Sequence, residues 1–249
     1  MSDVAVSVKG LSKRFGDKHV YQGLDLEVRR GEVLTVLGAS GSGKSVLLKL
    51  LIGLYKPTAG QILIGETDIV PLDEEHLREV RKKVGMLFQG AALFDSMSVG
   101  ENVAYGLDEA WPRAKIAARV AECLEWVGLP GIERMRPSDL SGGMKKRVGL
   151  ARALAPGPEV ILYDEPTTGL DPSNALRINE LIVSLKERLH VTSIVITHDI
   201  GAALAVSDRV GLLLDHKIAL VVDAETVKRD PPAALAAFMR GEEAERKAS

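Results

Sequence analysis

Apolar and polar positions alternate with short periods in some parts of the chain and with helical spacing in others. Alternation over residues 4–30, interrupted by a Gly-Asp turn at 16–17, predicts antiparallel strands that form a β layer. Short apolar runs predict buried strands at 32–37, 84–89, 160–165 and 191–197, a further β segment at 60–70 and a closing hairpin at 210–222. Helices are expected after residue 45, at 73–83, from 171 to about 189, and at 231–239. This order predicts an α/β fold.

The strand pattern stops after Gln89, which predicts a helical subdomain inserted at 90–158. We expect a single domain over 1–249, with an α/β core at 1–89 and 159–240 and a disordered charged tail at 241–249. Within the subdomain, Ser98 and Glu101 form a capping-box pattern, and Cys123 falls on an apolar helix face, where a core position is expected rather than a reactive thiol. The basic cluster Lys145 to Arg147 is predicted to be a solvated helix face.

Composition narrows the classes of partner. The chain has 249 residues and a formal net charge of -2, so no global basic field points to nucleic acid. One cysteine allows no internal disulfide, and the first residues do not resemble a signal peptide, so we expect a cytoplasmic protein. The longest apolar stretches are far too short to span a bilayer, so any service to a membrane is expected from outside it.

The segment Gly38 to Ser45 fits the phosphate-binding pattern G-x-x-x-x-G-K-[ST] at every fixed position. A predicted strand precedes it and a predicted helix follows it, as that pattern requires. The glycines let successive N–H groups point inward at the positive end of the helix dipole, which makes an anion nest. Lys44 would reach the β- and γ-phosphates, and the Ser45 hydroxyl would bind Mg²⁺. The alternative is an ordinary glycine-rich turn.

Polar residues follow three of the predicted buried strands. Asp164 and Glu165 end one strand, where Asp164 suits a magnesium partner and Glu165 a general base. Gln89 ends another, either as a contact to Mg²⁺ or the attacking water or as a plain polar terminus. His198 ends the third, either as a hydrogen-bond partner of a γ-phosphate or as a structural residue.

Three further features lie in loops and at helix starts. Phe15, upstream of the glycine loop, either stacks on adenine or plugs a local gap. Ser141, Gly142 and Gly143 open a helical run and would offer bare N–H groups as a second anion site, although such tripeptides are also ordinary caps. Asp171 has the position of an N-cap, with Pro172 at the first helical position.

Together, in this order, these motifs resemble those of the ATP-binding-cassette (ABC) ATPases over nearly the whole chain. The resemblance implies a P-loop NTPase (RecA-like) core, ATP and Mg²⁺ as ligands, and a homodimer that closes head to tail around two ATP molecules. It also implies roles for single residues. The expected ATP contacts are Phe15, Gly38, Ser40, Gly41, Gly43, Lys44, Ser45 and Val46. The expected metal contacts are Ser45, Gln89 and Asp164, and the catalytic ones are Glu165, His198 and Gln89. The contacts to the partner subunit's ATP are Ser141, Gly142, Gly143 and Asp171.

One departure narrows the resemblance. Met144 stands where the wider family usually has Gln, so any polar contact of that amide is lost. With the segment Phe88 to Val99, it makes the chain similar to the Mla or MCE-type cassettes, which power phospholipid transport between the bacterial inner membrane and the outer envelope. This resemblance implies an MlaE-like integral-membrane permease docked near Gly90 to Phe94, a lipid-binding MCE-domain protein, and a place on the cytoplasmic face of the inner membrane. Ordinary packing is the other interpretation of Gly90 to Phe94.

Alternative functions remain open at this point. The chain could power an importer of a small polar solute such as an amino acid. A soluble cassette acting on nucleic acid or the ribosome is disfavoured. Such proteins usually carry paired cassettes or a long coiled-coil insertion, and this sequence shows neither pattern. A regulatory module that binds ATP without cleaving it is disfavoured by the intact Lys44, Asp164, Glu165 and His198.

Overall fold

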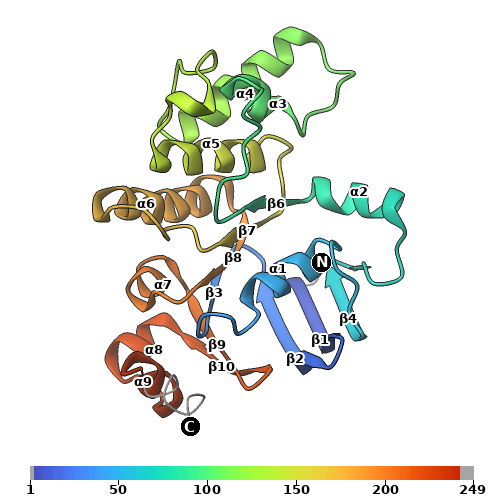
Figure 1. The fold of residues 1–249 in the computed structure, drawn as a ribbon, viewed down its shortest axis with the longest axis vertical. Coiled ribbons are helices and arrows are strands. Elements are labelled where there is room, and N and C mark those ends of the chain that lie inside the picture. Colours follow the sequence, from blue (N-terminus) through green and yellow to red (C-terminus); the bar gives the residue numbers. More distant parts are fainter. Residues whose placement is uncertain (1–2, 242–249) are drawn as a thin grey trace. The chain divides into compact units, whose positions relative to one another are not determined.

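The computed structural model describes residues 3–241 and divides the chain into two compact units. The first unit ends at Val80 and resumes at Thr192, and the second runs from Arg81 to Val191. Figure 1 labels the helices and strands of both units. The expected tail at 241–249 lies, apart from its first residue, outside the described residues.

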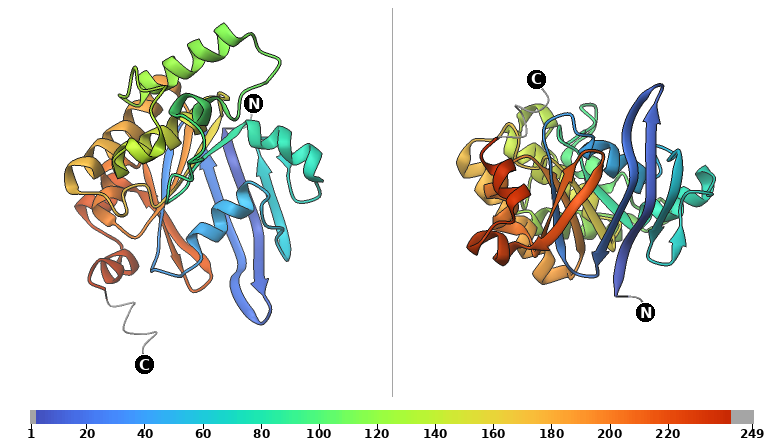
Figure 2. Two further views of the ribbon diagram at one scale, coloured as in Figure 1. Left: turned by 45° about the horizontal axis from the view of Figure 1, so that its top comes forward. Right: turned by 90° about the horizontal axis from the view of Figure 1, so that it is seen from below.

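An antiparallel sheet opens the first unit, as the alternating pattern predicts. Strands β1 (Val4–Phe15) and β2 (Lys18–Arg29) form a long hairpin around the Gly16-Asp17 turn, and both panels of Figure 2 show them side by side. Strands β4 (Ala59–Ile64) and β5 (Thr67–Asp68) complete the strand order β2-β1-β4-β5. From Leu24 to Arg29 of β2, buried apolar residues alternate with exposed polar ones, so one face of this sheet contributes to the core.

Parallel strands carry the glycine loop in the same unit. Strand β3 (Val33–Leu37) is buried throughout and pairs in parallel with β8 (Thr192–Thr197) and β9 (Arg209–Leu214), and β10 (Lys217–Asp223) pairs antiparallel with β9. The helices of this unit are α1 (Lys44–Leu51), α7 (Ile200–Val206), α8 (Ala224–Arg229) and α9 (Ala233–Met239). Leu37, Leu212 and Leu235 belong to the core cluster that joins β3 and β9 to the last helices.

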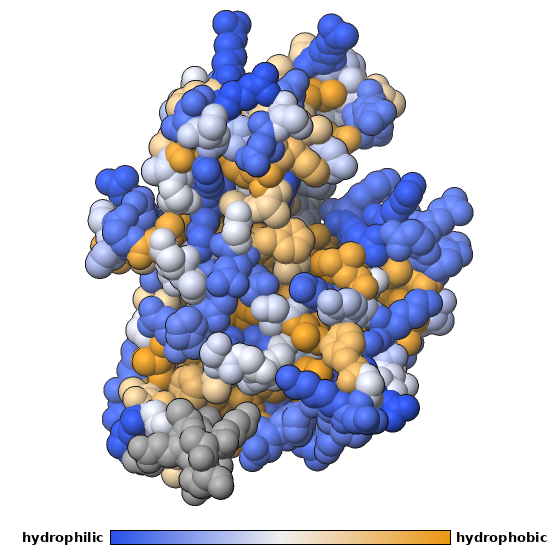
Figure 3. Space-filling view, viewed as in Figure 1, coloured by the Kyte–Doolittle hydropathy of each residue, from blue (hydrophilic) through white to orange (hydrophobic). Residues whose placement is uncertain are grey.

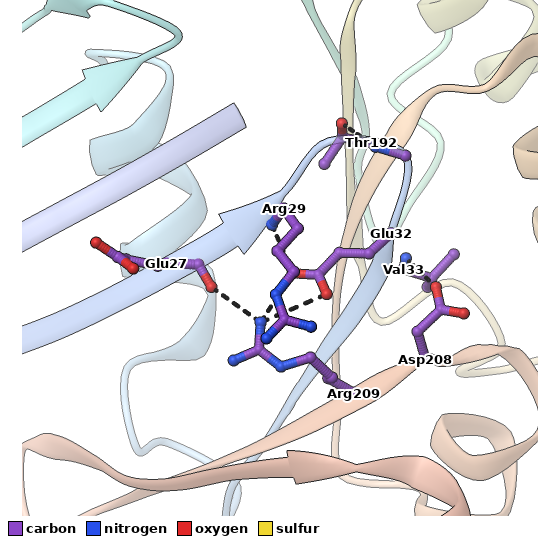
Figure 4. Close-up of polar contacts among 8 residues, drawn as sticks. Glu27, Arg29, Glu32, Val33, Thr192, Asp208 and Arg209 are labelled. Atoms are coloured by element: carbon purple, nitrogen blue, oxygen red, sulfur yellow. Dashed lines mark hydrogen bonds and ion pairs between the residues drawn. The ribbon is translucent and has the colours of Figure 1, made fainter. Parts of the chain in front are cut away.

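A polar network holds the corner through which the chain enters β3 (Figure 4). Glu32 accepts a hydrogen bond from the Arg29 N–H at 2.6 Å and forms an ion pair with Arg209 at 3.1 Å. Asp208 accepts from the Val33 N–H at 2.8 Å, and Thr192 accepts from the backbone N–H of Gly31 at 3.0 Å. The entry to β3, which leads directly into the glycine loop, is therefore tied to the starts of β8 and β9.

The second unit contains the parallel pair β6 (Val84–Leu87) and β7 (Val160–Asp164) and most of the helical segment. Its helices are α3 (Val99–Ala104), α4 (Arg113–Trp126), a 3-10 turn (Pro137–Asp139), α5 (Gly142–Leu154) and α6 (Pro172–Leu189). The charged helix α2 (Glu74–Lys82) contains the division between the units, and Figure 3 shows hydrophilic side chains over it.

Local signals predicted the helix ends well. The capping box of Ser98 and Glu101 is confirmed, and Ser141 and Asp171 are N-caps whose side chains accept a backbone N–H.

Cys123 is fully buried, and burial raises the pKa of its thiol to about 11, as expected for a core residue. Helices α7 and α8 were not predicted. None of the helices among residues 3–241 is both long and apolar enough to cross a bilayer.

Candidate functional site

The glycine loop between β3 and α1 has the backbone geometry of an anion nest. Gly41 and Gly43 have φ angles of 75° and 104°, in the left-handed region that disfavours side chains, and Gly43 is the N-cap of α1. A Cβ on Gly43 would lie 2.6 Å from Val20 Cγ1, and one on Gly38 would lie 3.1 Å from the Leu213 carbonyl oxygen. Gly43 therefore requires glycine for both conformation and space, and Gly38 requires it for space.

Lys44 is the first residue of α1 and is buried, with 6% of its surface exposed. Its ammonium donates to the carbonyl oxygens of Gly38 at 2.8 Å and Ala39 at 3.1 Å, so it lies across the mouth of the loop. The half-buried Ser45 and Val46 follow in the first helical turn. A fixed ammonium beside a glycine loop at a helix N-terminus suits a polyphosphate chemically.

Tyr21 on β2 is hydrogen-bonded to the glycine loop, a contact that the sequence patterns did not predict. Its side chain is fully buried, and its hydroxyl donates to the Gly43 carbonyl oxygen at 2.6 Å. Burial raises the pKa of Tyr21 above its ordinary value, so the phenol remains a neutral donor. No local sequence signal marks this contact, because the two residues are 22 positions apart.

A pocket of about 580 Å³ lies against the loop and is contained in the first unit. Phe15 lines it and is 42% exposed, so its ring is not a buried plug. Tyr55 packs edge-on against Phe15 with 5.3 Å between ring centroids, and the Lys13 ammonium lies 4.6 Å from the Phe15 centroid. The other lining residues are Lys18, His19, Val20, Ala39, Ser40, Gly41, Ser42, Gly43, Val46, Leu213, Leu214, Asp215 and His216. An aromatic ring and an anion nest on one pocket suit a nucleotide with phosphates.

His198 lies at the same strand edge as the glycine loop. Strand β8 pairs with β3 in a register that sets Thr197 opposite Leu37, and His198 and Gly38 are the next residues of the two strands. The carboxyl ends of parallel strands form the ligand-binding edge of such sheets. His198 is exposed there, as a residue that senses a phosphate group must be.

Gln89, Asp164 and Glu165 come together in the second unit. The parallel register of β6 and β7 sets Leu87 opposite Tyr163, so Gln89 and the two carboxylates leave the pair at one edge. Gln89 is exposed, whereas Asp164 and Glu165 are buried. The register therefore places these three expected residues at the same edge of the strand pair.

The turn after β7 fixes Glu165. Its φ angle is 47°, and its carboxylate accepts a hydrogen bond from the Thr168 hydroxyl at 3.0 Å. The Lys146 ammonium donates to the carbonyl oxygens of Glu165, Pro166 and Thr168. The expectation that Lys145 to Arg147 form a solvated face is thus wrong for Lys146, which is 5% exposed because this turn packs over α5.

The expected second anion segment begins α5. Ser141 Oγ accepts the Met144 N–H at 3.3 Å, and Met144 is partly exposed in the first turn. A Cβ on Gly143 would lie 2.6 Å from Asn174 Oδ1, so only glycine allows this close packing. Asn174 Nδ2 donates to Asp171 at 2.6 Å, and this hydrogen bond holds the pKa of the Asp171 carboxyl below its ordinary value. The exposed Ser141, Gly142 and Asp171 lie near one another through these contacts.

The segment Gly90 to Phe94 follows Gln89 and is held by Arg152 of α5. Arg152 donates to the carbonyl oxygens of Ala92 at 2.7 Å and Ala91 at 2.9 Å. Phe94 is 39% exposed and Tyr105 is 61% exposed, and the centroids of their rings are 4.6 Å apart. Two neighbouring exposed aromatic rings form an apolar feature of the kind found at protein interfaces.

The residues expected to contact Mg²⁺ each carry an oxygen donor. No group of three or more His, Cys, Asp or Glu residues that could hold a metal occurs among residues 3–241. Ser45 in the first unit offers a hydroxyl oxygen, and Gln89 and Asp164 in the second unit offer amide and carboxylate oxygens. These are hard ligands of the kind that Mg²⁺ takes together with phosphate oxygens and water.

Comparison with known proteins identifies close relatives. A family model described as ABC transporter matches residues 21–168. The intermembrane phospholipid transport system ATP-binding protein MlaF of Haemophilus influenzae is 40% identical, over 97% of this chain and 92% of its own. The methionine import ATP-binding protein MetN 2 of Rhodococcus jostii is 47% identical over 78% of this chain, which spans 58% of that relative. The probable ribonucleotide transport ATP-binding protein mkl of Mycobacterium leprae is 40% identical over 96% of this chain and 69% of its own.

Solved structures of ABC proteins are also similar to this chain. The chain matches cbiO1 from Clostridium perfringens, part of the ABC transporter complex cbiONQ, with a TM-score of 0.85 and 30% identity over 96% of both chains. It also matches the ATP-binding cassette MJ0796, in a dimeric post-hydrolysis state bound to ADP and Pi, with a TM-score of 0.80 and 32% identity. That match covers 88% of this chain and 98% of the other.

Proposed function

The chain belongs to the ABC transporter family, whose ATPase subunits bind and hydrolyse ATP, and from that premise we propose that it powers transport of a phospholipid or related lipid through a separate permease. The match to an intermembrane phospholipid transport ATP-binding protein over 97% of this chain and 92% of the relative carries the proposal. Met144 and the segment Phe88 to Val99, which resemble the Mla or MCE-type cassettes, support it further.

We propose that the first unit binds the nucleotide. Phe15 stacks on adenine, and the backbone N–H groups of the loop, with Lys44, bind the phosphates. The loop contacts are Gly38, Ser40, Gly41, Gly43, Lys44, Ser45 and Val46. His198 donates a hydrogen bond to the γ-phosphate from the edge next to the loop. Support comes from the pocket that Phe15 and the loop share and from the register that sets Thr197 opposite Leu37.

In the second unit, we propose that Glu165 accepts a proton from the attacking water and that Gln89 orients this water. Gln89 and Asp164 of this unit and Ser45 of the first unit are the proposed Mg²⁺ contacts, and the ion would neutralise charge that develops on the phosphates during transfer. Ser141, Gly142 and Gly143 would contact the γ-phosphate held by a second copy of the chain, and Asp171 would lie at the junction. The buried position of Glu165 beside the Thr168 hydroxyl supports its role, since it fixes the carboxylate in one orientation.

The proposed assembly is a homodimer on the cytoplasmic face of the inner membrane, with a permease bound near Gly90 to Phe94 and a lipid-binding MCE-domain protein in the same complex. The dimeric state of the related cassette MJ0796 supports the homodimer. The exposed pair Phe94 and Tyr105 supports a docking surface next to Gln89. No nucleic-acid partner is proposed, in keeping with the net charge of -2.

A pull-down of the tagged chain from solubilised native membranes, followed by mass spectrometry of proteins and lipids, tests the lipid proposal. We expect a small polytopic permease, an MCE-domain protein and bound phospholipid. The Phe94→Asp variant is expected to lose the permease, whereas Leu54→Asp, at a residue 51% exposed outside Gly90 to Phe94, retains it. A different permease with a solute-binding protein would overturn the lipid substrate, and ribosomes or DNA would overturn the transport role.

A second candidate function is import of a small polar solute such as an amino acid. The observation in its favour is the identity to methionine import ATP-binding proteins, 47% for the Rhodococcus jostii relative and 44% for the one from Nocardia farcinica. Both candidates share the ATPase chemistry. The pull-down separates them, because only the identity of the recovered permease and ligand differs.

A further inference from the structure

Lys146 places a buried positive charge under the turn that carries Glu165. Its residue surface is 5% exposed, and Nζ donates to the carbonyl oxygens of Glu165 at 3.2 Å, Pro166 at 2.8 Å and Thr168 at 2.7 Å. An ammonium has three N–H donors. Three carbonyl oxygens at hydrogen-bond distance therefore use its full donor capacity, and all three belong to one turn.

This turn is conformationally strained. Glu165 has a φ angle of 47°, in the left-handed region that is unfavourable for a residue with a side chain. Within the turn, the Thr168 N–H donates to the Glu165 carbonyl oxygen at 3.3 Å, and the Thr168 hydroxyl donates to its carboxylate at 3.0 Å. Strained backbone persists only where its surroundings hold it. Lys146 supplies that hold by gathering three carbonyl dipoles that would otherwise repel one another.

The charge is costly at this position. Burial lowers the pKa of Lys146, and the nearby carboxylates of Glu165 and Asp164 act in the opposite direction. A hydrophobic side chain would fill a buried space at a lower desolvation cost. The ammonium instead contributes three directed hydrogen bonds, which fix the orientation of the turn and not merely its packing.

Lys146 also joins this turn to the helix that starts at Ser141. It lies five residues after Ser141 on α5, at roughly 7.5 Å along the axis. Gly143 on the same helix packs against Asn174, which bonds to Asp171. The first two turns of α5 are thus attached at two points to the segment that runs from Glu165 to Asn174.

We propose that Lys146 is a positioning residue for ATP hydrolysis: it holds the Glu165 turn on the helix that begins with the Ser141 segment. The inference rests on the proposed role of Glu165 as the general base. In the proposed dimer, the first residues of α5 face the partner subunit's ATP. Because Lys146 joins α5 to the turn, a shift of α5 would move Glu165 with it. The substrate-facing groups remain Glu165 and Ser141, and Lys146 acts through them.

A double-mutant cycle tests this role in the full-length purified chain. Lys146→Met keeps an unbranched side chain that ends at Cε and removes the ammonium donors, and we expect kcat to fall about 10- to 100-fold, since a misplacement near 1 Å costs about 100-fold. The KM for ATP should remain within about twofold, because a group that acts on the chemical step leaves binding intact. Lys146→Gln, with two donors left, should recover part of the lost kcat. Lys145→Met, at the adjacent and partly exposed lysine, is the matched control and should resemble the wild type.

The informative comparison is Glu165→Gln with and without Lys146→Met. If Lys146 acts through Glu165, adding Lys146→Met to Glu165→Gln should lower residual kcat by no more than about twofold, since coupled residues are non-additive. Multiplying effects, or a wild-type kcat in Lys146→Met, would overturn the inference. Should Lys146→Met fail to fold, the same cycle with Lys146→Gln decides by the same criterion. Wild-type kcat in Glu165→Gln alone would instead overturn the proposed base.

Discussion

The carbonyl oxygen of Gly43 accepts three hydrogen bonds at the start of α1. The backbone N–H groups of Val46 and Leu47 donate at 2.7 and 3.3 Å, and the Tyr21 hydroxyl donates at 2.6 Å. The helical bonds come with any helix, whereas the Tyr21 bond comes from a different strand. At the scale of single residues, the glycine loop is therefore also held by a phenol that the pattern G-x-x-x-x-G-K-[ST] does not contain.

Tyr21→Phe should lower the free energy of unfolding by about 1 kcal/mol, because one hydrogen bond is lost while the carbonyl keeps its helical donors. Urea denaturation measures this change. Tyr105→Phe is the control, since Tyr105 is 61% exposed and its hydroxyl is not enclosed by the core. An unchanged midpoint for Tyr21→Phe would show that the hydroxyl adds nothing to the stability of the loop.

Helix α3 shows how an element is closed by its own sequence. Ser98 Oγ accepts the Glu101 N–H at 3.2 Å, and Glu101 accepts the Ser98 N–H at 2.6 Å. The hydrogen bond from the Ser98 N–H lowers the pKa of the Glu101 carboxyl below its ordinary value of 4.5. Since the folded-state pKa lies below the unfolded one, the stabilisation is complete above the unfolded pKa and is lost as pH falls through the folded pKa.

Glu101→Gln should therefore be less stable than the wild type at pH 7, and the difference should shrink as pH falls below 4.5. Thermal unfolding of both proteins across this pH range measures it. Glu125→Gln, at an exposed glutamate on α4, provides a control for loss of one negative charge. A difference that grows toward low pH would contradict the assigned sign.

At the scale of the whole molecule, the proposed site is complete only in a dimer. The segment at Ser141 and the loop at Gly38 are the two proposed anion sites, and the proposed head-to-tail arrangement uses one from each subunit for each ATP. Removing hydrolysis while keeping binding should therefore stabilise the dimer, because the bridging ligand persists.

Glu165→Gln should bind ATP, lose at least about 100-fold in turnover as expected for loss of a general base, and accumulate as a dimer with ATP and Mg²⁺. Size-exclusion chromatography with light scattering measures the mass. Lys44→Ala is the matched control and should remain monomeric, because its phosphate binding is weakened. A monomeric Glu165→Gln protein at saturating ATP would argue against the bridging arrangement.

The sequence by itself determined the features that depend on neighbours in the chain. Strand alternation, the caps at Ser98, Ser141 and Asp171, and the strand-loop-helix context of Gly38 to Ser45 all rest on residues a few positions apart. The edge location of Gln89, Glu165 and His198 also followed, because a parallel strand delivers the residue after it to a known edge. The ABC transporter family model matches residues 21–168, the part of the chain that contains the glycine loop, the Ser141 segment and the strand before Glu165.

The tertiary structure alone decided which side chains are buried against distant segments. Lys146 belongs to a basic cluster whose composition predicts a solvated helix face. Its ammonium instead donates hydrogen bonds to carbonyl oxygens about 20 positions away. Tyr21 and Gly43 are 22 positions apart, and Arg209 and Glu32 are 177 apart. Periodicity reports only which face of an element is apolar. Whether a charged or hydroxyl group is enclosed depends on the segment that packs over it, and that segment is specified by the folded chain.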